Sequence, residues 1–145
     1  TVNWWRKMTK DYLQDFRDNH PSVIMNSMKK IIKKEYLNEL QNTIICPSPF
    51  GIGEICYRDF EAFISGALLL KPNMNHLKTW PNLFEDGETY ISHRWDFSNF
   101  EEKLIDILER PGKYEAIARE GQRRFISALS DGQSFADHFF NMVNL

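Results

Sequence analysis

The chain has 145 residues, of which 42% are hydrophobic and 14% aromatic, enough apolar material for the core of one compact domain. Its formal net charge of −2 argues against a general nucleic-acid-binding protein, whose affinity depends on a broad basic surface. No apolar run approaches the ~20 residues that cross a bilayer, and Cys46 and Cys56 form no CxxC pair with histidines at zinc spacing. We therefore expect a cytoplasmic domain with reduced cysteines and no metal.

Residues 1–42 are predicted to form an N-terminal helical segment. The first helix has an apolar stripe at intervals of three and four residues, formed by Trp5, Met8, Tyr12 and Phe16. Pro21 ends this helix, and a second helix is predicted over residues 27–41. Residues 22–26 remain open: they either extend that helix or form a short strand at residues 23–25.

Residues 28–36, "MKKIIKKEY", concentrate positive charge in the second helix. We interpret the lysines as the solvated face of the helix. The alternative is a patch that binds anionic lipid, which would give the domain a peripheral contact with a membrane.

From residue 43 the pattern changes to alternating strands and helices. "TIIC", residues 43–46, is a short apolar run typical of a buried strand, and "PSPFGIG" turns the chain. A helix is predicted over residues 54–65, ended by Gly66. Its inward side chains are expected to be Phe60, Phe63 and Ile64.

Two further strands and three helices are predicted beyond Gly66. The strands are "ALLLKP", residues 67–72, and "ETYISH", residues 88–93, with one helical turn between them. Ser98 and Glu101 have the spacing of a capping box at the start of the next helix. The inward stripe of the last helix is expected to contain Phe135, Phe139 and Met142.

Strands separated by helices predict a parallel sheet that is covered on both faces. The expected fold is a Rossmann-like three-layer α/β/α domain over residues 43–145, with a short sheet of three to four strands. Extra helices lie at both ends of the chain.

The glycine turn is the first candidate site. A turn between a strand and a helix is a place where anions bind, and Gly51 and Gly53 let the backbone approach a phosphate. Glu54, Arg58 and Glu61 are spaced four and three apart, so on a helix they would line one face. A plain tight turn and a solvent-exposed row of ion pairs explain the same residues without a ligand.

These residues resemble a known family. The run "PFGIGE … RDFEA … SGALLLKP" is similar to the nucleotide-sugar-binding half of group-one glycosyltransferases with the GT-B fold. Their motif "P-x-G-x-G-E … R-x-x-E-A-x-x-x-G" precedes a strand that ends in "KP". The resemblance covers about residues 36–110 and is specific over residues 47–72.

The resemblance implies a substrate for this region. Gly51, Ile52 and Gly53 would lie against the diphosphate of a nucleoside-diphosphate sugar, Glu61 would bind the ribose hydroxyls, and Arg58 would meet the phosphate charge. The Lys71 side chain, at the end of the second strand, is either solvated or adds charge near the ligand.

The resemblance also places Glu54 at the position of the family's catalytic glutamate, near the donor sugar. The family's two glutamates are separated by seven residues, whereas six residues separate Glu54 from Glu61. This difference in spacing weakens the assignment of the catalytic role to Glu54 more than the assignment of ribose binding to Glu61.

The function implied by the resemblance is transfer of a sugar to an acceptor such as a glycan or a lipid-linked saccharide, without a cofactor or a metal. In the family an N-terminal domain supplies the acceptor side, so we expect this chain to be half of a longer enzyme. The alternative is an inactive nucleotide-binding or interaction module that keeps the fold.

Overall fold

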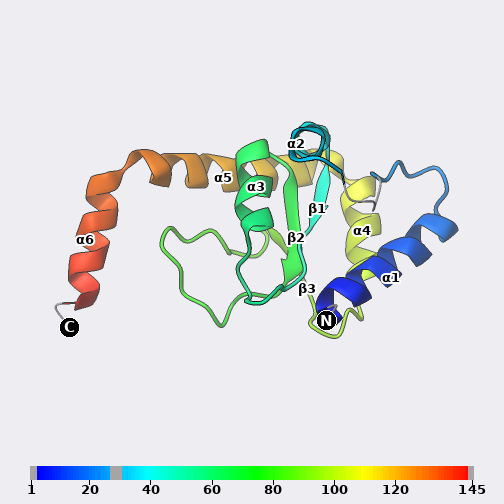
Figure 1. Ribbon diagram of the computed structural model, residues 1–145, viewed down its shortest axis with the longest axis horizontal. Helices are drawn as coiled ribbons and strands as arrows, with labels where there is room; N and C mark the ends of the chain where they lie inside the picture. Colours follow the sequence, from blue (N-terminus) through cyan, green and yellow to red (C-terminus); the bar gives the residue numbers. More distant parts are fainter. Residues whose placement is uncertain (1–2, 27–30, 144–145) are drawn as a thin grey trace.

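The computed structural model describes residues 3–26 and 31–143 (Figure 1). Its helices are α1 (Trp4–Asn19), α2 (Lys33–Gln41), α3 (Tyr57–Ser65), α4 (Phe100–Glu109), α5 (Pro111–Ser130) and α6 (Gly132–Val143). Its strands are β1 (Ile45–Pro47), β2 (Leu68–Pro72) and β3 (Ile91–His93).

The three strands form one parallel sheet in the order β1-β2-β3, which confirms the predicted parallel sheet. Ile45 pairs with Leu68, and Leu70 pairs with Ile91. Residues 23–25 form neither a strand nor a helix, so the optional fourth strand is not found in the described part of the chain.

The side chains of β2 point alternately to the two faces of the sheet, and each face has its own core. Leu68 and Leu70 pack with Phe16 of α1 and with residues of α4. Leu69 packs on the opposite face with Phe63 of α3. The domain is thus a mixed α/β structure with helices on both faces, and α1 shares a core with the sheet.

α3 begins at Tyr57, three residues later than predicted. Gly66 ends it in the left-handed conformation, with φ of 78°, as its position predicts. Phe63 is buried, but Ile64 is 54% exposed, so its predicted inward position is wrong. The buried face of α3 instead contains Asp59 and Ala62 beside Phe63.

α2 begins at Lys33 rather than at residue 27. Residues 27–30 lie outside the described residues, and residues 31–32 are not helical. Leu40 is the buried residue of this helix, with 5% exposure. Lys33 and Lys34, the described lysines of the basic cluster, are exposed.

The predicted capping box at α4 is wrong. Asn99 precedes the helix, and the N–H of Ser98 donates to the carboxylate of Asp96 at 3.0 Å. Asn99 in turn accepts the N–H of Arg94 at 2.8 Å. The polar side chains before α4 therefore order the loop that leaves β3, and none caps the helix.

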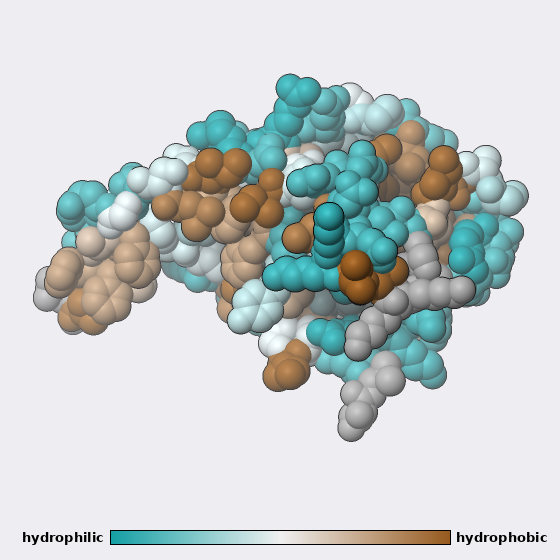
Figure 2. Space-filling model, turned by 45° about the horizontal axis from the view of Figure 1, so that its top comes forward, coloured by the Kyte–Doolittle hydropathy of each residue, from teal (hydrophilic) through white to brown (hydrophobic). Residues whose placement is uncertain are grey.

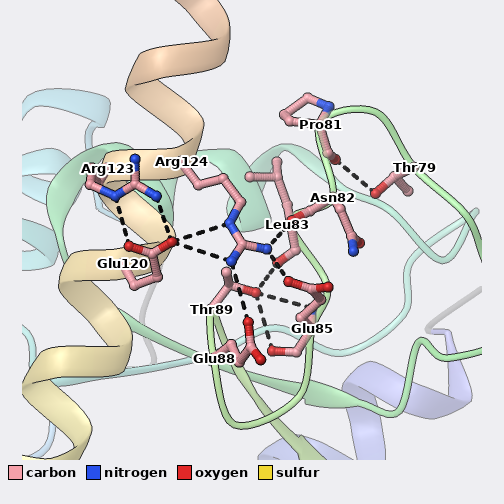
Figure 3. Close-up of polar contacts among 10 residues, drawn as sticks. All are labelled: Thr79, Pro81, Asn82, Leu83, Glu85, Glu88, Thr89, Glu120, Arg123 and Arg124. Atoms are coloured by element: carbon pink, nitrogen blue, oxygen red, sulfur yellow. Dashed lines mark hydrogen bonds and ion pairs between the residues drawn. The ribbon is translucent and has the colours of Figure 1, made fainter. Parts of the chain in front are cut away.

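The connection from β2 to β3, residues 73–90, has no helix. Arg124 of α5 holds this loop: it donates to the carbonyl oxygen of Asn82 at 2.9 Å and pairs with Glu85 (Figure 3). It also lies 3.4 Å from Glu88 and 3.2 Å from Glu120. One guanidinium thus joins three acidic residues, which fastens the loop to α5.

α6 leaves the body of the domain at the end of α5 (Figure 1). Its predicted inward stripe is wrong, because Phe135, Phe139 and Met142 are 54%, 46% and 55% exposed. Figure 2 shows an apolar surface at the left end of the view, the end at which α6 lies in Figure 1. Trp80 packs against this helix, with ring centroids 5.3 Å from Phe135. Among the described residues, no helix combines the length and apolar character that a bilayer crossing requires.

Candidate functional site

The loops that follow the three strands meet at one edge of the sheet. Trp95, after β3, donates its Nε1–H to the carbonyl oxygen of Asn73, after β2, at 2.8 Å. The same indole ring lies edge-on to Phe50, after β1, with 5.5 Å between centroids. In an open parallel sheet, ligands bind outside the carboxyl ends of the strands. This edge is therefore the candidate site.

The glycine turn, residues 51–53, offers backbone donors at this edge. The N–H of Gly51 donates to the carbonyl oxygen of Gly53 at 2.9 Å, which closes the turn. Within the described part of the chain, the N–H groups of Ile52, Gly53 and Glu54 have no acceptor. Ile52 is fully exposed, and a Cβ on Gly53 would meet only one atom, at 3.9 Å. Successive free N–H groups in a turn suit an anion.

The start of the helix after the turn holds one of the protein's own carboxylates. Asp59 accepts the N–H of Cys56, the N-cap residue of α3, at 3.0 Å. Asp59 is completely buried. This donor is therefore not available to an external anion, whereas the donors of the glycine turn are.

The first turn of α1 covers one side of the glycine turn. Asn3, the N-cap of α1, donates its side-chain amide to the carbonyl oxygen of Gly51. Nη2 of Arg6 lies 3.1 Å from the point where a Cβ on Gly51 would stand. A Cβ at residue 51 would make this guanidinium shift by a few tenths of an ångström, so the two groups are in close contact.

Glu54, Arg58 and Glu61 do not line one helix face, because residue 54 lies in the loop before α3. Glu61 accepts a hydrogen bond from the hydroxyl of Tyr36 on α2, at 2.9 Å. Burial, together with this hydrogen bond, raises the pKa of Tyr36 to about 12, so it remains a donor at neutral pH. Arg58 lines a cavity of about 580 Å³ beside α2 and β1.

Glu54 pairs instead with His76. Oε1 of Glu54 lies 2.9 Å from Nε2 of His76, and both side chains are more than one third exposed. The imidazole ring is edge-on to Trp95, with 5.3 Å between centroids. A carboxylate that holds one imidazole nitrogen leaves the other free to bind a ligand or to accept a proton.

Lys71, the last residue but one of β2, lies at this edge but is not solvated, since its side chain is completely buried. Its Nζ lies 3.1 Å from Asp59 and 3.4 Å from the carbonyl oxygen of Ser48. The hydroxyl of Ser48 donates to the second oxygen of Asp59 at 2.5 Å. The charge of Lys71 is thus compensated within the protein, and the pair joins β2, α3 and the loop after β1.

His93, the last residue of β3, is buried and neutral. It is 3% exposed, and its Nδ1–H donates to the carbonyl oxygen of Arg94 at 2.8 Å. Burial is the main cause that lowers the pKa of His93 from 6.5 to about 4, and the nearby charge of Lys71 adds to it.

We expect this histidine to make the domain sensitive to acid. The unfolded chain takes up a proton at His93 near pH 6.5, whereas the folded domain does so only near pH 4, so stability is lost as the pH falls through this window. The loss is about 3 kcal/mol at pH 4. Urea unfolding at pH 7, 5.5 and 4 measures this loss of stability. The His93→Gln variant has no imidazole to protonate, so between pH 7 and pH 4 it should lose about 3 kcal/mol less than the unchanged protein. The same acid loss in both proteins would contradict the prediction.

Several of these residues were not predicted from the sequence. Asp59 carried a signal, because it lies four residues before Phe63 and therefore on the inward stripe of α3, where a carboxylate needs a buried partner. His76 carried no such signal, because it lies 22 positions after Glu54 in the chain. Arg6 carried no sequence signal either, since only the packing of α1 brings it to the glycine turn.

Comparison with known proteins adds no relative to this description. The chain matches no protein-family model, no curated protein and no solved structure. Among residues 3–26 and 31–143, no group of three or more His, Cys, Asp or Glu side chains is arranged to hold a metal ion.

Proposed function

We propose that this domain binds a nucleoside-diphosphate sugar and forms the donor half of a glycosyltransferase with the GT-B fold. The observation that supports the proposal best is the glycine turn, with its free N–H groups, at the carboxyl edge of a parallel sheet. The mixed α/β structure is compatible with the Rossmann-like domain that such a half contains. The motif around the turn, with Glu54, Arg58 and Glu61, supplies the resemblance.

The nucleotide would be bound by the backbone and by Glu61. The N–H groups of Ile52, Gly53 and Glu54 would donate to the diphosphate, whose negative charge increases as it leaves the sugar. One oxygen of Glu61 accepts from Tyr36, which leaves the other oxygen for a ribose hydroxyl.

The sugar would lie at the other end of the turn, against Glu54 and His76. A carboxylate and an imidazole can bind sugar hydroxyls, and the half-exposed ring of Trp95 beside them offers an apolar surface. No side chain has to attack the sugar, because positioning of donor and acceptor can supply much of the rate. A second domain would present the acceptor, a glycan or a lipid-linked saccharide.

Thermal unfolding in the presence of UDP, GDP and ADP tests the proposal. A ligand at 100 times its Kd adds about 2.7 kcal/mol to the free energy of unfolding. A raised Tm with at least one of the three nucleotides is expected. An unchanged Tm with all three would overturn the proposal, both for an active enzyme and for an inactive nucleotide-binding module.

Glu61→Ala should weaken nucleotide binding roughly 10- to 100-fold, because a charged hydrogen bond to the ribose is lost. The Tm without ligand should change little, since the bond that Glu61 makes to Tyr36 is only partly buried. Isothermal titration calorimetry with the nucleotide that raises the Tm most measures the affinity.

Tyr36→Phe is the matched control. It removes the same hydrogen bond but keeps the carboxylate, so the nucleotide affinity should stay close to that of the unchanged protein. Equal losses of affinity in the two variants would assign Glu61 a structural role.

A further inference from the structure

The proposed diphosphate site needs a cation, and the two cations chosen from the sequence lie elsewhere. Lys71 is buried and paired with Asp59. Arg58 lines a cavity beside α2 and β1 whose lining residues do not include the glycine turn. Neither side chain therefore brings an uncompensated charge to residues 51–53.

Arg6 of α1 does lie against the turn. Its Nη2 is 3.1 Å, and its Cζ 3.9 Å, from the Cβ position of Gly51. The side chain is exposed, and the described residues give it no ion-pair partner. An arginine in this state has its five donors available for a phosphate.

Contacts of the two residues Asn3 and Trp5, just before Arg6, hold the first turn of α1 in this place. Trp5, the preceding residue, lies against Phe50 with 4.9 Å between centroids and against Trp95 with 6.0 Å. Asn3 accepts the N–H of Trp5 at 2.9 Å and donates to Gly51. The first turn of α1 is thus joined to the loops after β1 and β3, so the backbone of Arg6 is held beside the glycine turn.

We propose that Arg6 is the cationic residue of the diphosphate site and binds the phosphate that the N–H groups of Ile52, Gly53 and Glu54 receive. This inference rests on the proposed nucleotide-binding function and adds α1 to the site. Guanidinium and backbone donors together match the several oxygens of a diphosphate, because each phosphate accepts from more than one side. The carboxylate of Glu54, at the end of the turn, is engaged in its hydrogen bond with His76.

Arg6→Gln and its neighbour Lys7→Gln provide the test. Both variants remove one exposed positive charge from the same turn of α1, but successive helical residues point in different directions, about 100° apart. Calorimetry with inorganic pyrophosphate and with UDP, GDP and ADP gives the affinities. We expect Arg6→Gln to weaken diphosphate binding roughly 10- to 100-fold and Lys7→Gln to weaken it less than about 3-fold.

Arg6→Lys is a control for a change in folding. It keeps the positive charge but replaces the planar guanidinium group with an ammonium group. It should bind more weakly than the unchanged protein and more tightly than Arg6→Gln. If the unchanged protein binds a nucleotide and Arg6→Gln binds it equally well, the inference fails while the proposed function stands. Binding of pyrophosphate but of no nucleotide, with loss in Arg6→Gln, would support the Arg6 site and overturn the nucleotide function. No binding of any of the four ligands overturns both.

Discussion

Lys71→Ala is expected to destabilise the domain by about 3–5 kcal/mol, because it leaves the Asp59 carboxylate buried without its counter-charge. Both side chains are completely inaccessible to solvent. A domain of this kind has a total stability of about 5–15 kcal/mol, so the loss is a large part of it. Urea unfolding at pH 7 measures the change.

Two further variants separate the buried charge from a general loss of packing. Lys71→Met combined with Asp59→Asn removes both charges and keeps an oxygen for the N–H of Cys56, so it should be more stable than Lys71→Ala. Arg119→Ala breaks an exposed pair with Glu115 and should change the stability by less than about 1 kcal/mol. If the double variant is no more stable than Lys71→Ala, the charge is not the cause.

The same pair bears on the site. Asp59 holds the N–H of Cys56, the hydroxyl of Ser48 and the ammonium of Lys71, so it orders both ends of the loop that contains the glycine turn. We therefore expect the shape of the turn to depend on residues that a ligand does not touch.

Gly121→Ala is the second substitution with a large expected effect. A Cβ at residue 121 would stand 2.5 Å from the carbonyl oxygen of Thr89 and 2.9 Å from the ring of Phe63. α5 would have to move away from α3 and from the loop before β3, which costs about 1–3 kcal/mol or more. Thermal and urea unfolding should both show the loss.

Gly112→Ala is its control on the same helix. Nothing lies within 4 Å of a Cβ at residue 112, so this change should cost nothing and can add up to about 1 kcal/mol of helix propensity. Similar losses at both positions would mean that glycine affects α5 through its backbone and not through the close approach at residue 121.

Much of the fold follows from local patterns. The apolar spacing of Trp5, Met8, Tyr12 and Phe16 predicts α1, and the short runs "TIIC" and "ALLLKP" predict two neighbouring parallel strands. These signals succeed because the periods of a helix and of a buried strand are properties of a few consecutive residues. The prediction that Gly66 ends α3 is confirmed for the same reason, since a left-handed helix end is a local conformation.

The predictions that failed depended on what lies opposite a segment. Phe135, Phe139 and Met142 have the spacing of a core stripe, yet α6 extends past the sheet and leaves them exposed. Ser98 and Glu101 have the spacing of a capping box, yet Asp96 holds the N–H of Ser98. Periodicity shows which side of an element is apolar, but it does not show whether another element covers that side.

For the candidate site, the amino-acid sequence alone located the glycine turn and the carboxyl edge of the sheet, because both follow from the order strand, turn, helix. The partners of each charge had to come from packing across the chain: Glu54 with His76, Lys71 with Asp59, and Arg6 with the turn itself. A charged side chain acts on whatever lies within a few ångströms, and its neighbours in space are 12 to 45 residues away in the chain. Burial then determines which of these charges is compensated and which is available to a ligand.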